Sequence, residues 1–135
     1  MELVRPAQPA DIGRIVRMTM QLVKAVDGPQ EVDPCHTGAQ LLRLIQSPQA
    51  GVWVSDGGFI AGEVVQTIIS PEPVAVEHGW IATDRSGLRL LMAFEAWAAT
   101  MGCAKIKMST AACHGVAGEL LRRRGYKAAE MAWVK

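Results

Sequence analysis

Residues 84–108 read DRSGLRLLMAFEAWAATMGCAKIKM and predict a turn, a long helix and a short strand in succession. We expect the helix over Leu88–Met101, because apolar side chains recur there at the spacing of one helical face. Gly102 is a typical residue to end a helix, and Lys105–Met108 then reads as a strand. The whole stretch therefore predicts a helix that joins one strand to the next.

The sequence before this stretch predicts an antiparallel meander. Its strands are separated by two turn signals, Asp56-Gly57-Gly58 and Pro71-Glu72-Pro73. Alternating and β-branched residues on either side of these turns favour strands over helices. The three strands predicted here are Gly51–Ser55, Phe59 to about Ile69, and Val74–Thr83.

The two ends of the chain supply the remaining elements. Pro9 is a plausible first helical residue, and the breaker cluster Asp27-Gly28-Pro29 should end that helix. The other predicted elements are a strand at Glu2–Arg5, a helix at Thr37–Gln46, a helix at Gly115–Arg124 and a strand at Tyr126–Val134. The order is β-α-α-β-β-β-α-β-α-β, which indicates one α+β domain over residues 1–135, with a mixed, mostly antiparallel sheet flanked by helices.

Composition narrows the class of function. The formal net charge is +1, so no strong field favours an obligatory nucleic-acid or membrane partner. No apolar run approaches the roughly 20 residues of a membrane helix, and the first residues do not resemble a signal peptide. The three cysteines lack C-x-x-C spacing, which favours a reducing cytoplasm over a disulfide framework.

The junction before the long helix is a candidate anion site. The first backbone N–H groups of a helix have no partner within the helix, and its dipole favours negative charge at that end. Here the candidate donors are the amides of Arg85 through Arg89. Gly87 would allow a phosphate to approach closely, while the Arg85 and Arg89 side chains could add charge-assisted hydrogen bonds. Taken alone, such a junction is more often a plain connection.

Three stretches together resemble the GNAT (Gcn5-related N-acetyltransferase) superfamily. Gly51–Gly62 looks like its second and third strands, Gly87–Met108 like its coenzyme-binding helix and following strand, and Ala117–Tyr126 like its last helix. The resemblance covers nearly the whole chain in order, and it is closest to small GNAT proteins of the kind found in tailed bacteriophage genomes. A phage-encoded member would work in the cytoplasm of a bacterial host.

The resemblance implies acetyl-CoA as co-substrate and no metal. It implies that backbone groups of Ile81, Ala82 and Thr83 meet the pantetheine arm, if their strand splays from the next. The pyrophosphate would lie on the loop and first helical turn, and Ser109 or Thr110 could protonate the leaving thiolate. The residues assigned to coenzyme binding are Ile81, Ala82, Thr83, Arg85, Ser86, Gly87, Leu88, Arg89 and Ser109.

This sequence departs from the family pattern in two places. The family loop usually reads Q/R-x-x-G-x-G/A, whereas Ala82 and Arg85 stand here at the first and fourth positions when Gly87 is aligned last. Alternatively, the loop is several residues shorter. The family also often has a tyrosine acid in the last helix, where this chain has Leu121.

An attacking amine must lose a proton, because a lysine-type amine has a pKa of about 10.4. Glu77 and His78, on the fourth predicted strand, are the candidate bases. Side chains alternate along a strand, so only one of the two can face a given side of the sheet. A solvated carboxylate and a structural histidine are the plainer interpretations. Cys35-His36 and Cys113-His114 could suggest zinc, but their spacing is not that of a known zinc site.

Three functions fit these observations. The leading hypothesis is an N-acetyltransferase that acetylates a primary amine by direct attack, the acceptor being a small molecule or a protein amine. The second is a catalytically degenerate GNAT-fold module that binds CoA or a protein partner. The third is a purely structural or interaction protein. The chain after Gly125 is short, so a homodimer could cover the last sheet edge.

Overall fold

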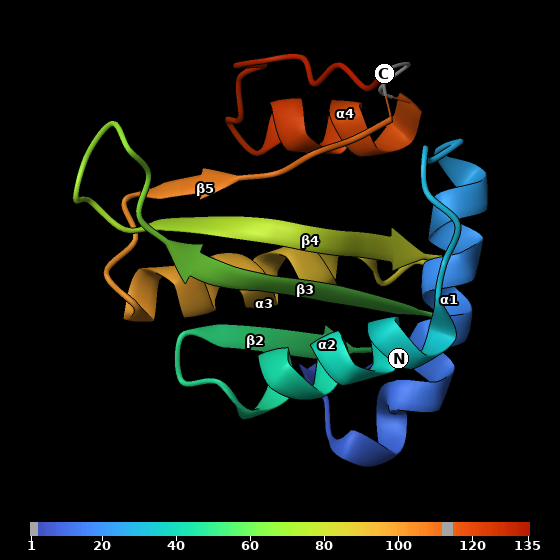
Figure 1. The fold of residues 1–135 in the computed structure, drawn as a ribbon. Helices are drawn as coiled ribbons and strands as arrows, with labels where there is room; N and C mark the ends of the chain where they lie inside the picture. The colour runs from blue at the N-terminus through green and yellow to red at the C-terminus, as the bar shows by residue number, and fades with distance from the viewer. Residues whose placement is uncertain (1–2, 112–114) are drawn as a thin grey trace.

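The computed structural model describes residues 3–111 and 115–135, and Figure 1 shows their arrangement. One five-stranded sheet runs in the order β1-β2-β3-β4-β5. The first four strands are antiparallel neighbours, and β5 pairs parallel to β4. The described elements are β1 Arg5–Pro6, η1 Pro9–Asp11, α1 Ile12–Ala25, α2 Pro34–Gln46, β2 Ala50–Val54, β3 Gly58–Val65, β4 Val74–Ala82, α3 Gly87–Thr100, β5 Lys105–Lys107 and α4 Gly115–Arg123.

Helices cover both faces of the sheet. In Figure 1, α2 lies in front of the strands and α3 lies behind them. The front layer buries Ile15 of α1 and Leu41 of α2 against Phe59 of β3. The back layer buries Leu90 and Phe94 of α3 in a second apolar cluster. The predicted α+β class and mixed, mostly antiparallel sheet are therefore confirmed.

Close packing of α3 on the sheet depends on a glycine. A Cβ atom added to Gly62 would lie 2.4 Å from the Val76 carbonyl oxygen and 2.5 Å from the Phe94 ring. Phe94 also packs edge-on to Trp53, with ring centroids 6.0 Å apart, and lies against Trp97. A larger residue at position 62 would push α3 away from the strands.

A bulge interrupts the register of β3 and β4. Ala61 pairs with Gly79, but the next residue, Gly62, pairs with Glu77. His78 is therefore the extra residue on β4. A bulge bends its strand and changes the direction of nearby side chains, which matters because both candidate bases lie at this point.

The helices and the long middle strands were predicted well, and the first and last strands were not. The predicted last strand, Tyr126–Val134, is wrong: residues 126–135 form no strand. Met131 and Trp133 are exposed there, so the segment lacks the packed neighbour that a strand needs. The first strand is Arg5–Pro6 instead of Glu2–Arg5.

Smaller differences concern element ends. Helix α2 begins earlier than predicted, at Pro34, because the side chain of Asp33 caps it by accepting from His36 N. Strand β3 ends at Val65 and leaves Ile69 in an exposed loop. Gly102 follows α3 with a φ of 77°, as a helix-ending glycine should. Within the described residues, we find no helix with the length and apolarity needed to cross a bilayer.

Candidate active site

Strands β4 and β5 part after a short parallel ladder. Their register covers Val74–Val76 and Lys105–Lys107, while β4 continues to Ala82. The amide of Ser109 donates to Glu77 Oε1 at 2.9 Å, and its hydroxyl donates to the same oxygen at 3.2 Å. The Glu77 carboxyl thus holds the point at which the two strands separate. Burial raises its pKa, although the Ser109 hydrogen bonds act in the opposite direction.

A buried hydroxyl chain fixes the start of α3. Ser86, which is fully buried, donates its hydroxyl to Asp84 Oδ1 at 2.5 Å and its amide to the same oxygen at 2.9 Å. Since that hydroxyl proton goes to Asp84, the buried Ser55 hydroxyl, 2.6 Å away, must donate to Ser86 Oγ. The Ser86 hydroxyl is the main reason that the pKa of Asp84 lies below its usual value. The chain ties the loop after β2 to the loop before α3.

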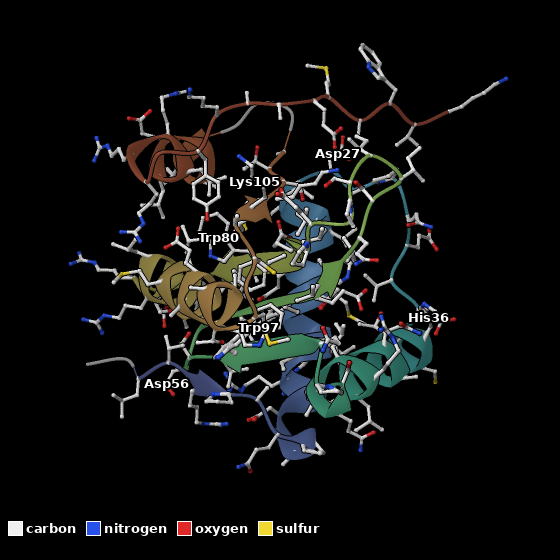
Figure 2. The ribbon with its side chains drawn as sticks, turned by 90° about the vertical axis from the view of Figure 1, so that its left-hand side faces the viewer. Asp27, His36, Asp56, Trp80, Trp97 and Lys105 are labelled. Carbon is white, nitrogen blue, oxygen red and sulfur yellow. The ribbon has the colours of Figure 1, made fainter. Side chains whose placement is uncertain are left out.

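The first turn of α3 keeps its amide donors near the end of β4. The first helical backbone bond runs from Leu90 N to Ser86 O at 2.9 Å, so the amides of residues 87–89 lie before the helix ladder begins. Trp80 Nε1 donates to the Gly87 carbonyl at 3.1 Å and braces this turn. Figure 2 shows Trp80 on the α3 side of the sheet. A Cβ atom at Gly87 would meet Ala82 Cβ at 3.6 Å, an ordinary contact.

The other predicted coenzyme residues surround this turn. Arg85, Leu88 and Arg89 are exposed. Thr83 donates both its amide and its hydroxyl to the Gly57 carbonyl, at 2.8 and 3.0 Å. Ile81 packs against the α1–α2 core, whereas Ala82 packs against the α3 core. All of these residues lie after the end of the β4–β5 ladder, as the predicted coenzyme path requires. Ser109 follows β5 and lies on the other side of the opening between the two strands.

The two candidate bases lie on opposite faces of β4, in agreement with the alternation of side chains along a strand. His78 turns toward α1 and α2, where it lines a pocket of about 160 Å³. Its Nε2 lies 2.9 Å from Glu63 Oε1, while Arg43 of α2 donates to the other Glu63 oxygen at 3.0 Å. The hydrogen bond from Arg43, and after it the hydrogen bond from His78, lowers the pKa of Glu63. An ionised Glu63 can only accept, so Nε2 carries the proton and Nδ1 keeps a free lone pair.

Sequence reasoning missed Glu63. It lies on β3, fifteen residues before His78, and its partner depends on a register set by the bulge. The pocket also receives His36 from α2, which Figure 2 shows on the side of the sheet away from α3.

The C-terminal part of the chain docks on α3. Leu121, at the position of the family tyrosine, is buried. Tyr126 donates its hydroxyl to Glu95 Oε2 at 2.9 Å, and Arg124 donates to the other Glu95 oxygen at 2.5 Å. Burial, and then the Glu95 carboxylate, raises the pKa of Tyr126 far above its usual value. These bonds hold α4 over α3.

The zinc interpretation gains no support from the described part of the chain. No group of three or more histidine, cysteine or acidic side chains gathers there as metal ligands would. Cys35 is exposed, and Cys103 is buried as a free thiol. Cys113 and His114, the other two residues considered as zinc ligands, lie outside the described residues.

Solved structures of other proteins share this fold. No protein-family model matches the sequence, and no curated protein sequence matches it. Among solved structures, a transcriptional regulator from Bacillus halodurans has a TM-score of 0.81 at 16% identity, over 100% of this chain and 99% of that one. The aminoglycoside N-acetyltransferase AAC(6')-Iy in complex with CoA has a TM-score of 0.78 at 14% identity, over 100% and 93%.

A further neighbour is a putative acetyltransferase from Arthrobacter, with a TM-score of 0.75 at 20% identity, over 100% of this chain and 91% of that one. These identities are low, but the matches span nearly the full length of each chain. The chain therefore has the fold of the GNAT acetyltransferases.

Proposed function

We propose that this protein is an N-acetyltransferase that transfers an acetyl group from acetyl-CoA to a primary amine by direct attack. The observation that carries the proposal is the opening between β4 and β5, with the first turn of α3 at one end and a histidine-lined pocket across the sheet. The fold shared with a CoA-bound N-acetyltransferase supports it.

Acetyl-CoA would lie along the part of β4 that has left β5. The backbone of Ile81, Ala82 and Thr83 would run beside the pantetheine arm, and Ser109 would face it from the chain after β5. The pyrophosphate oxygens would accept hydrogen bonds from the backbone amides of the first α3 turn. Gly87 would leave room for the phosphate, and the Arg85 and Arg89 side chains would add positive charge beside it. Leu88 and the braced Ser86 belong to the same turn.

His78 would act as the general base. The acceptor amine gives a proton to His78 Nδ1, and its nitrogen attacks the thioester carbonyl carbon. Glu63 holds the imidazole through Nε2 and stabilises the imidazolium that forms, as an orienting carboxylate does in other base–carboxylate pairs. The carbon–sulfur bond then breaks, and the thiolate can leave with help from water because its solution pKa is about 8.5.

Glu77 would position the site instead of taking the proton. It is 8% exposed and accepts both Ser109 hydrogen bonds at the point where the strands part. Removing the carboxylate would let β5 and the following segment shift, and so would change the coenzyme site.

A second candidate is a module with this fold that binds CoA without transferring the acetyl group. The buried Leu121 favours it, because a leucine cannot protonate the leaving thiolate. A homodimer also stays a prediction: β5 is an edge strand of the described sheet, and the segment after α4 does not pair with it as a strand, although Glu130 forms an ion pair with Lys107 of β5. Sedimentation equilibrium of the full chain would measure the oligomeric state.

Acetyl transfer to an amine mixture, followed by mass spectrometry, tests the transferase proposal. The wild-type protein should give acetylated amine and free CoA in equal amounts. His78→Ala should lose roughly a hundredfold or more in rate, with acetyl-CoA binding retained. Binding of acetyl-CoA with no acetylated product from any amine would favour the second candidate.

A further inference from the structure

The pocket on the α1–α2 side of the sheet is built mainly from apolar side chains. Leu22 of α1, Leu41 and Leu44 of α2 and Phe59 of β3 line it. Of these, Leu41, Leu44 and Phe59 are buried members of the main core, so the wall is rigid rather than a loose surface. Its volume is about 160 Å³, which is close to that of a known apolar cavity, about 150 Å³, that accepts one benzene molecule.

The polar groups of the pocket are few, and they are uncharged or titratable imidazoles. Among the described residues that line it, there is no carboxylate and no lysine or arginine; His36 and His78 are the ionisable groups. Glu63 is the carboxylate in contact with this lining, through His78. One of its oxygens already accepts a hydrogen bond from Arg43, and the other is hydrogen-bonded to His78. No carboxylate of this described lining is therefore left to form an ion pair with a further ammonium group.

Charge and shape together select the acceptor. Moving an unpaired ammonium into an apolar pocket costs several kcal/mol, whereas filling the pocket with an apolar group is favourable. A polyamine or an aminoglycoside brings several ammonium groups and would have to leave most of them unpaired. A molecule with one amine can give one proton to His78 and place its carbon skeleton against the leucines and Phe59.

We infer that the acceptor is a small monoamine with an apolar body of about the size of a benzene ring, joined to the amine by a short chain. This inference rests on the proposed acetyltransferase function and deepens it, because it assigns the substrate class. It separates the chain from those structural neighbours that are aminoglycoside acetyltransferases by name.

The experiment combines direct binding with acetyl transfer. Binding of 2-phenylethylamine is followed by isothermal titration and by NMR shifts of the protein, with and without CoA. Transfer from acetyl-CoA is then compared among 2-phenylethylamine, ethanolamine, spermidine and kanamycin. We expect kcat/KM for 2-phenylethylamine to exceed that for each other amine by about tenfold or more, the usual range of hydrophobic-pocket discrimination.

Two matched variants on one helix locate the bound ring. Thr37 lines the pocket and Ala39, two residues later on α2, does not. Thr37→Phe should fill the pocket and lower the affinity for 2-phenylethylamine about tenfold or more, with acetyl-CoA binding unchanged. Ala39→Phe, an equal addition of apolar bulk at an exposed position, should leave both unchanged.

The outcomes separate the two claims. Binding of 2-phenylethylamine that Thr37→Phe removes, without any acetyl transfer, would support the assigned ligand class and refute the transferase. Faster transfer to spermidine or kanamycin would refute the ligand class and leave the transferase in place. Failure of 2-phenylethylamine to bind, or acetylation of a peptide that begins with phenylalanine but not of the free amine, would also overturn the inference.

Discussion

Nε2 of His78 lies 2.9 Å from Oε1 of Glu63, and the two side chains meet beside the α1–α2 pocket although fifteen residues separate them in the sequence. Glu63 stays ionised beside Arg43 and His78, which lower its pKa. The imidazole is thereby held with its proton on Nε2, and Nδ1 is available to accept.

Replacement of Glu63 by glutamine should slow transfer more than it weakens binding. A glutamine can donate to Nε2 and so stabilise the tautomer that has no lone pair on Nδ1 toward the substrate. We expect kcat to fall roughly a hundredfold, with little change in the affinity for acetyl-CoA. Steady-state kinetics and titration calorimetry on the same preparation measure both. Glu119→Gln, which changes an exposed carboxylate of α4 that pairs with Arg122, is the control and should keep nearly full activity.

Glu77→Gln should change how stability depends on pH. The folded-state pKa of Glu77 is raised, mainly by burial, so between the ordinary and the raised value the folded protein binds more protons than the unfolded chain. Its free energy of unfolding must then fall as pH rises through that window. Glutamine keeps an acceptor for Ser109 but does not titrate.

Urea denaturation from pH 4 to pH 8 measures this effect as a difference. The wild type should lose stability relative to Glu77→Gln as pH rises above the usual range of a glutamate, about 4.3. Asp11, Asp84 and Glu63 have lowered pKa values and titrate below that window, and they are the same in both proteins. If the stability of the two proteins varied with pH in parallel, the raised folded-state pKa of Glu77 would be refuted.

Ser86→Ala should destabilise the protein and loosen the coenzyme loop. The change removes the hydroxyl donor to Asp84 and leaves the buried Ser55 hydroxyl with only the more distant Gly58 carbonyl, 3.4 Å away, as acceptor. A broken buried hydrogen bond of this kind costs about 1–3 kcal/mol. Thermal or urea unfolding measures the loss. In a double-mutant cycle, Ser55→Ala added to Ser86→Ala should cost much less than it does alone; additive costs would refute the hydroxyl chain.

The sequence predicted most of the fold because the middle elements carry local signals. The helix after Ser86 has a regular apolar face, and the turn at Asp56 has its two glycines. The last strand was predicted wrongly: Tyr126–Val134 has strand-forming residues, but it does not pair with the edge strand β5 and contacts it through the Lys107–Glu130 ion pair. Propensity describes a residue's local preference, whereas a strand also requires a partner.

The site was only partly predictable for the same reason. The β4–α3 junction and the two candidate bases were found from local pattern, and they do lie on opposite faces. Glu63 and the apolar pocket depend on the register between β3 and β4 and on the packing of α2, which single-residue patterns do not encode. A bulge shifts side-chain direction without a clear sequence signal.

Titration calorimetry with acetyl-CoA, on wild type and on variants at Gly87, tests the central claim most directly. The backbone at Gly87 has room for a Cβ atom, 3.6 Å from the nearest side chain, so Gly87→Ala and Gly87→Asn should fold and bind. Gly87→Asp places a negative charge at the first turn of α3 and should weaken binding about tenfold or more relative to Gly87→Asn. The predicted result is micromolar binding by wild type, retained in the alanine and asparagine variants and weakened about tenfold or more by aspartate alone. No binding by wild type up to millimolar concentration, or equal binding by the aspartate and asparagine variants, would contradict the assigned coenzyme site.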